Sequence, residues 1–145
     1  MIKLISDKTT GQLSASGKIE LDATLETPIF ISIFGGNVQG ITTNDRNPSG
    51  VANLDWFGNL YLKEMNKPLF NSKFEKFLKE NPLSSGNLNT LNQYALSDLQ
   101  WIVNSKAVKS FSIDLEITGA NSLKIEITAT EPDNTKSQYQ YLWTS

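Results

Sequence analysis

The sequence predicts an α+β domain in which helices cover one face of an antiparallel sheet. After Val108, apolar side chains recur at odd positions in three stretches, and most even positions between them are polar. The apolar positions are Phe111, Ile113, Leu115, Ile117, Leu123, Ile125, Ile127, Ala129, Tyr139, Tyr141 and Trp143. A period of two indicates strands with one buried and one wet face. We therefore expect a meander of three or more strands.

The register of the meander follows from keeping the odd residues on one face, which requires paired positions to sum to an even number. Three-residue loops at 119–121 and at 132–134 both satisfy this rule. The first loop places Asn121 at the left-handed position that such loops require. The predicted pairs are Ile117 with Leu123, Leu115 with Ile125, Ile113 with Ile127, Ile127 with Tyr139, and Ile125 with Tyr141.

The expected cover for the sheet is a long helix from about Leu88 to Asn104. Its apolar stripe has helical spacing and consists of Leu88, Leu91, Ala95, Leu99 and Ile102. The preceding Ser84-Ser85-Gly86 is expected to be a hinge-like connector. A shorter helix before it should open with a capping box, Ser72-x-x-Glu75, and end before Pro82.

Two further helices are expected upstream. One runs from about Leu25 to Phe34, is capped by Thr24 or Thr27, and ends at Gly35-Gly36. Its β-branched isoleucines keep a strand open as an alternative. The other covers about 56–65 and ends at Pro68.

The rest of the chain is expected to complete a single domain of 145 residues. Residues 1–21 predict an arm or small hairpin, from which Ile19 and Leu21 would join the sheet or lie over it. Residues 35–55 predict a long surface loop, a kind of segment that is often functional. Residues 87–145 hold the helix and meander.

The composition argues against several classes of function. The net charge of −2 does not suit a nucleic-acid binder. The chain contains no cysteine and no histidine, so thiolate chemistry is excluded and the commonest general base is missing. No apolar run has the length of a membrane span, and the start lacks the apolar core of a signal peptide.

The motifs that might carry chemistry are weak. Glycines at 35 and 40 have phosphate-loop spacing, but the lysine that would contact phosphate is missing. Asp22 and Glu26 are better explained as helix-start charges than as a hydrolytic pair. Asp45 and Asp55 are best explained as solvated turn residues. We therefore expect no catalytic residues, no metal site, no cofactor and no enzymatic activity.

Protein contacts are the better-supported expectation. From Ser137 to Ser145 the last strand contains no proline and no charged residue, so it has little protection against edge pairing. A partner could add a strand there, using backbone hydrogen bonds for affinity. Aromatic residues elsewhere are also typical of interfaces. The candidate interface residues are Asp45, Arg46, Trp56, Phe57, Gln138, Gln140, Leu142 and Trp143.

A series of short motifs resembles the baseplate protein family of Mu-like phages over most of residues 10–143. The motifs are Leu25-Glu26-Thr27 followed by Ile29 to Phe34, Asp45-Arg46, Trp56-Phe57-Gly58, Leu99-Gln100-Trp101-Ile102, and Tyr139 to Trp143. More distantly, the series resembles the sheath-initiator wedge proteins of T-even phages and other contractile tails.

This resemblance implies a structural subunit of the tail baseplate, made in the host cytoplasm and present in six copies. The implied partners are other wedge proteins, the tail sheath protein, and tube or hub proteins, with no nucleic acid or membrane. Asn44 to Pro48 departs from the element that sheath-initiator relatives carry after the first helix. The alternatives are a tail-associated peptidoglycan hydrolase and a tail adaptor or terminator.

Overall fold

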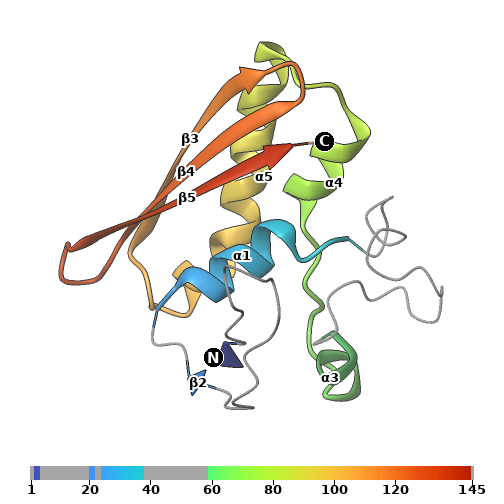
Figure 1. Ribbon diagram of the computed structural model, residues 1–145. Helices are drawn as coiled ribbons and strands as arrows, with labels where there is room; N and C mark the ends of the chain where they lie inside the picture. The colour runs from blue at the N-terminus through green and yellow to red at the C-terminus, as the bar shows by residue number, and fades with distance from the viewer. Residues whose placement is uncertain (1, 4–19, 22–23, 38–58, 145) are drawn as a thin grey trace.

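The computed structural model describes residues 2–3, 20–21, 24–37 and 59–144, and it has the predicted α+β architecture. A three-stranded antiparallel sheet crosses in front of a long helix, and two shorter helices complete that layer (Figure 1). The core lies between the sheet and the helices, and it draws on both. Helices therefore pack on one face of the sheet, as the alternating pattern predicts.

The sheet consists of β3 (Ser110–Gly119), β4 (Ser122–Thr130) and β5 (Lys136–Thr144), in the order β3-β4-β5. All five predicted residue pairs are confirmed. The odd residues of the middle strand are completely buried: Leu123, Ile125, Ile127 and Ala129. The even residues form the outer, solvent-facing surface.

The first loop of the meander differs from the prediction. Gly119 pairs with Ser122, and the register shifts between Ile117 and Gly119. The turn therefore holds two residues, and the additional residue lies in the strand as an irregularity near Thr118. Asn121 consequently does not adopt a left-handed conformation, whereas Asn134 in the second loop does, with φ of 69°.

The long helix α5 (Ser85–Asn104) begins three residues earlier than predicted. Ser85 and Gly86 belong to its first turn, so the hinge-like connector is wrong for these two residues. The predicted stripe is largely correct, since the side chains that α5 buries completely or nearly so are those of Leu91, Ala95, Leu99 and Ile102.

The predicted helix near the start of the chain is α1 (Glu26–Phe34), which settles the choice between helix and strand. Its N-cap residue is Leu25, and the hydroxyl of Thr24 accepts the Glu26 N–H at 3.4 Å. Thr27 lies inside the helix and is not its cap. The helix ends as predicted, because Gly36 adopts a φ of 87° that favours glycine.

The helix α4 (Lys73–Glu80) has Ser72 as its N-cap, and the Ser72 hydroxyl accepts the Glu75 N–H at 3.0 Å. The other half of the predicted capping box is wrong. The Glu75 carboxylate accepts the N–H of Gly36 at 2.8 Å, while the Ser72 N–H donates to the Gly36 carbonyl. The box is thus used to join α4 to the end of α1.

The remaining elements lie away from the sheet. Helix α3 (Asn59–Glu64) is the described part of the helix predicted over 56–65, and Asn66 follows it with φ of 53°. Strands β1 (Ile2–Lys3) and β2 (Glu20–Leu21) pair with each other in a separate two-stranded ladder. Leu21 therefore does not join the main sheet, and Ile19 lies outside the described residues. Of the loop predicted over 35–55, only 35–37 is described.

Candidate interface at the edge of strand β5

The outer edge of β5 presents free backbone groups at alternate residues. The N–H of Glu131 donates to the carbonyl of Thr135 at 2.8 Å, which makes these in-register residues a hydrogen-bonded pair. Hydrogen-bonded and non-hydrogen-bonded pairs alternate along an antiparallel ladder. The odd residues of β5 therefore direct their N–H and carbonyl groups toward β4. The even residues direct theirs outward, namely Lys136, Gln138, Gln140, Leu142 and Thr144.

The opposite edge of the sheet supports this assignment. By the same alternation the carbonyl of Ile113 on β3 points outward, and it accepts a hydrogen bond from the Asn92 amide of α5 at 2.7 Å. Helix α5 thus satisfies part of the β3 edge. In the part of the chain that the structure describes, no strand pairs with the outer edge of β5. The two edges of the sheet are therefore unequal.

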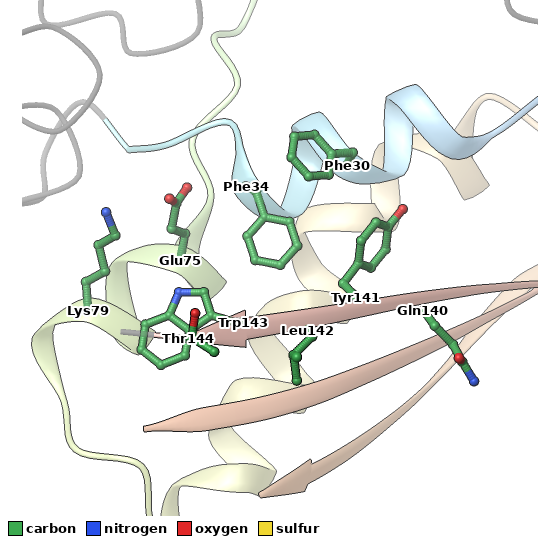
Figure 2. A pocket seen from close by; sticks show the side chains of 9 residues that line it. All are labelled: Phe30, Phe34, Glu75, Lys79, Gln140, Tyr141, Leu142, Trp143 and Thr144. Atoms are coloured by element: carbon green, nitrogen blue, oxygen red, sulfur yellow. The ribbon is translucent and has the colours of Figure 1, made fainter. Parts of the chain in front are cut away.

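A groove of about 550 Å³ runs between the β5 edge and helices α1 and α4. Figure 2 shows Phe30, Phe34 and Tyr141 gathered between α1 and β5, while Gln140 points away from them. The ring of Tyr141 lies 5.7 Å from that of Phe34 and 6.0 Å from that of Phe30, measured between centroids. Phe30 remains 49% exposed, so part of this aromatic wall faces solvent.

The hydroxyl of Tyr141 is buried and has no hydrogen-bond partner among the residues that the structure describes. Burial, with the charge of Glu26 as a smaller cause, raises the pKa of Tyr141 to about 12. Burial also raises the pKa of Tyr139, and the backbone of Leu25 acts in the opposite direction. A buried polar atom without a partner costs free energy, so the Tyr141 hydroxyl stands out.

A second cavity of about 300 Å³ adjoins the groove and is lined by Glu26 together with residues 138–141. Gln140 and Tyr141 line both cavities, which makes the two cavities neighbours along the same strand edge. Burial is the main cause that raises the pKa of both tyrosines, and the charge of Glu26 adds to it. The site therefore combines an aromatic groove that Glu75 and Lys79 also line, a row of backbone groups, and a smaller cavity beside Glu26.

The structure brings together only some of the predicted interface residues. Gln138 and Gln140 are exposed on the outer face, Leu142 is 68% exposed, and Trp143 is half-buried in the groove. Four other candidates lie outside the described residues: Asp45, Arg46, Trp56 and Phe57. The sequence reasoning missed Phe30 and Phe34 as site residues. Their i,i+4 spacing indicates a shared helix face, but not that this face meets β5.

The most buried carboxylates of α4 and α5 have structural roles. Asp98 of α5 accepts the N–H groups of Lys73 and Phe74 at 3.1 and 2.9 Å, and so caps α4. Burial raises the pKa of Asp98 to about 6, against the effect of these hydrogen bonds. Of the acids weighed as a hydrolytic pair, Asp22 lies outside the described residues, and Glu26 lies in the first turn of α1.

Comparisons with known proteins add no relative. No family model, no curated protein and no solved structure matches this chain. Within the described residues there is no group of three or more side chains suited to hold a metal ion. None of the described helices combines the length and apolarity needed to cross a membrane.

Proposed function

We propose that this chain is a structural assembly protein, without enzymatic activity, that binds a partner by accepting a strand along the outer edge of β5. The observation that carries the proposal is the outward N–H and carbonyl row at Gln138, Gln140 and Leu142, beside a partly exposed aromatic groove. An extended polypeptide supplies the matching donors and acceptors. From Ser137 onward this strand carries no charged residue, and an exposed edge of that kind is otherwise prone to aggregation.

The biological setting that we propose is the baseplate of a contractile phage tail, as the sequence resemblance implies. In that setting the chain is a wedge subunit that helps to nucleate the sheath, and sheath or wedge proteins would supply the added strand. Cryo-electron microscopy of tails from a phage encoding this chain tests the proposal. A tail without the chain, or one in which the β5 edge is bare, would contradict it.

A substitution at Gln140 tests the edge itself. Proline at this position removes the outward N–H, while the pairs with β4 remain because they use the neighbouring residues. We expect Gln140→Pro to fold but to abolish incorporation into tails. Gln140→Thr keeps the N–H at the same position and should be incorporated like the unaltered chain. Normal incorporation of the folded proline variant would rule out strand addition at this residue.

A further inference from the structure

We propose that the outer edge of β5 in the free chain pairs with β5 of a second copy, antiparallel, about a two-fold axis at Gln140. The pairing joins two sheets into one continuous antiparallel sheet, with the helices of both copies on the same face. The inference goes beyond the proposed function, because it concerns the chain before a tail partner binds the same edge.

The length of β5 allows the strand to pair with itself from end to end. It has nine residues, from Lys136 to Thr144, so its midpoint falls on Gln140. An axis at this residue sets Gln138 opposite Leu142 of the second copy, and Lys136 opposite Thr144. These even residues direct their N–H and carbonyl groups outward, so the facing pairs can exchange hydrogen bonds. An axis between two residues would instead set outward-directed groups against residues whose groups point toward β4.

The side chains that face each other in this register are compatible. On the inner face, Tyr139 lies opposite Tyr141 of the second copy, and such aromatic pairs stabilise antiparallel strands. The large Trp143 lies opposite the small Ser137. On the outer face, Lys136 is the charged residue of β5, and it meets the uncharged far end of the strand. The self-paired edge therefore sets no like charges directly opposite each other.

The inner face of β5 has apolar surface left to bury. The odd residues of β4 are completely buried, whereas Tyr139, Tyr141 and Trp143 of β5 are only half-buried. The groove of about 550 Å³ lies on this side of the sheet, between the β5 edge and the helices, and it leaves space there. A second strand at the edge would remove more of these rings from water, which favours association.

The charges beside the edge do not prevent self-pairing. Glu75 and Lys79 line the groove and have opposite signs, so together they add no net charge that two copies would share. Glu26 lines the smaller cavity. It is exposed, so the repulsion between its two copies is weakened by water and screened by salt.

The unequal edges of the sheet limit this assembly to two copies. The β3 edge is partly satisfied within the chain, because the Asn92 amide donates to the outward carbonyl of Ile113 at 2.7 Å. A two-fold contact uses the same edge of both copies and closes, so it does not propagate into a fibre. The pair therefore protects the uncharged edge from aggregation until a partner strand replaces the second copy.

Cysteine cross-linking tests the register, and the lack of natural cysteine makes each engineered thiol unique. Facing residues of a hydrogen-bonded pair have Cα atoms about 5.5 Å apart, which a disulfide can span. Gln140→Cys should therefore form a disulfide-linked dimer on mild oxidation of the full chain. Ser112→Cys is the matched control, because it places an exposed thiol on the outer face of the opposite edge strand. It should form no such dimer.

A mixture of two single variants tests the antiparallel arrangement. Gln138→Cys and Leu142→Cys should cross-link to each other when mixed, because these two positions face across the axis. Each variant alone should cross-link poorly, since its two thiols lie roughly 13 Å apart along the strand, which is too far for a disulfide. Equal cross-linking in the mixture and in the separate variants would overturn this register.

Sedimentation equilibrium measures the association without a cross-link. Because small interfaces are weak, we expect the unaltered chain to pass from monomer to dimer between about 1 μM and about 1 mM. Gln140→Pro removes the central N–H of each copy and should weaken the dimer at least about tenfold. Amide spectra establish that this variant is folded. A dimer that the folded proline variant leaves unchanged would overturn the proposal, because another surface would hold the copies together.

The failure of self-pairing can be told apart from the failure of the proposed function. A chain that stays monomeric at every concentration and gives no Gln140→Cys disulfide would overturn self-pairing alone. Strand addition by a tail partner would still be decided by the incorporation of Gln140→Pro into tails.

Discussion

The hydroxyl of Tyr141 is buried without a hydrogen-bond partner among the described residues, whereas that of Tyr139 is not a buried atom lacking a partner. This contrast between neighbouring inward-facing tyrosines gives a matched pair of substitutions. Tyr141→Phe removes an unsatisfied polar atom, so we expect the free energy of unfolding to rise by about 0.5–1 kcal/mol. Tyr139→Phe removes a hydroxyl that is not orphaned by burial, so it should change the free energy of unfolding by less than about 0.5 kcal/mol. Urea denaturation measures both, and a destabilised Tyr141→Phe would contradict the assignment of an orphaned hydroxyl.

Asp98 should make stability depend on pH in the acidic range. Its pKa is raised to about 6 from a usual value of 3.8, because burial disfavours its charge. The folded state therefore holds the proton more tightly than the unfolded state. The stabilisation from Asp98 is complete below about pH 4 and is lost as the pH rises through about 6, a change of up to about 3 kcal/mol.

The variant Asp98→Asn isolates this contribution from those of the other carboxyl groups. Asparagine keeps an acceptor oxygen toward the N–H of Phe74 but does not titrate. The free energy of unfolding of the unaltered chain, minus that of the variant, should fall between pH 4 and pH 6. Denaturation at a series of pH values measures the difference. A difference that rises, or stays constant, would show that the Asp98 pKa is not raised.

At the scale of elements, the joint between α1 and α4 depends on Ser72. Its hydroxyl accepts the Glu75 N–H, donates to the Ile33 carbonyl, and lies 3.3 Å from a carboxylate oxygen of Asp98. A single buried side chain thus connects α4 to the C-terminal end of α1 and to α5. Through α1, which carries Phe30 and Phe34, this joint also holds one wall of the groove in place.

Replacing Ser72 with alanine should lower the free energy of unfolding by about 1–2 kcal/mol, since a cap and a buried bond are lost together. Ser84→Ala is the natural control, because Ser84 is the N-cap of α5 but makes no side-chain capping bond. Its effect should stay within about 0.5 kcal/mol. Thermal or urea unfolding compares the two variants. Equal effects would mean that the hydroxyl of Ser72 does not stabilise the joint.

The elements themselves could be predicted wherever a periodic pattern was long. The meander and its register follow from the parity of eleven apolar positions. The turn is one residue shorter than predicted, but the irregularity near Thr118 keeps this parity. That is why the pairs were correct although Asn121 was misplaced. The partner of Glu75 could not be predicted, because a capping box describes contacts within one helix. Its contact with Gly36, 39 residues away, depends on how two helices meet.

For the whole molecule, the sequence indicated that the β5 edge is unprotected but not what lies beside it. The lack of charged residues from Ser137 to Ser145 can be read directly from the sequence, because it is a local property of the chain. The groove depends on the placement of α1 against β5, which no local pattern encodes. The orphaned hydroxyl of Tyr141 is likewise visible only in three dimensions, since its neighbour Tyr139 has the same sequence context but a different environment.

The fold as a whole should depend on the layer between sheet and helices and little on the outer face of the sheet. Ile125 lies at the centre of the middle strand and is fully buried, whereas Leu142 is 68% exposed. Ile125→Ala leaves a cavity in the core, so we expect the free energy of unfolding to fall by about 2–5 kcal/mol. Leu142→Ala should change it by less than about 0.5 kcal/mol.

Urea denaturation of the isolated chain compares these two variants, which each truncate a large aliphatic residue of the same sheet. Leu142 is mostly exposed, so truncating it removes little buried surface. A loss of several kcal/mol in Leu142→Ala would mean that the outer face of β5 is already covered by the chain itself. Such a cover would lie over the outward-facing side chains of the sheet, so the backbone groups at the β5 edge could still pair with an added strand.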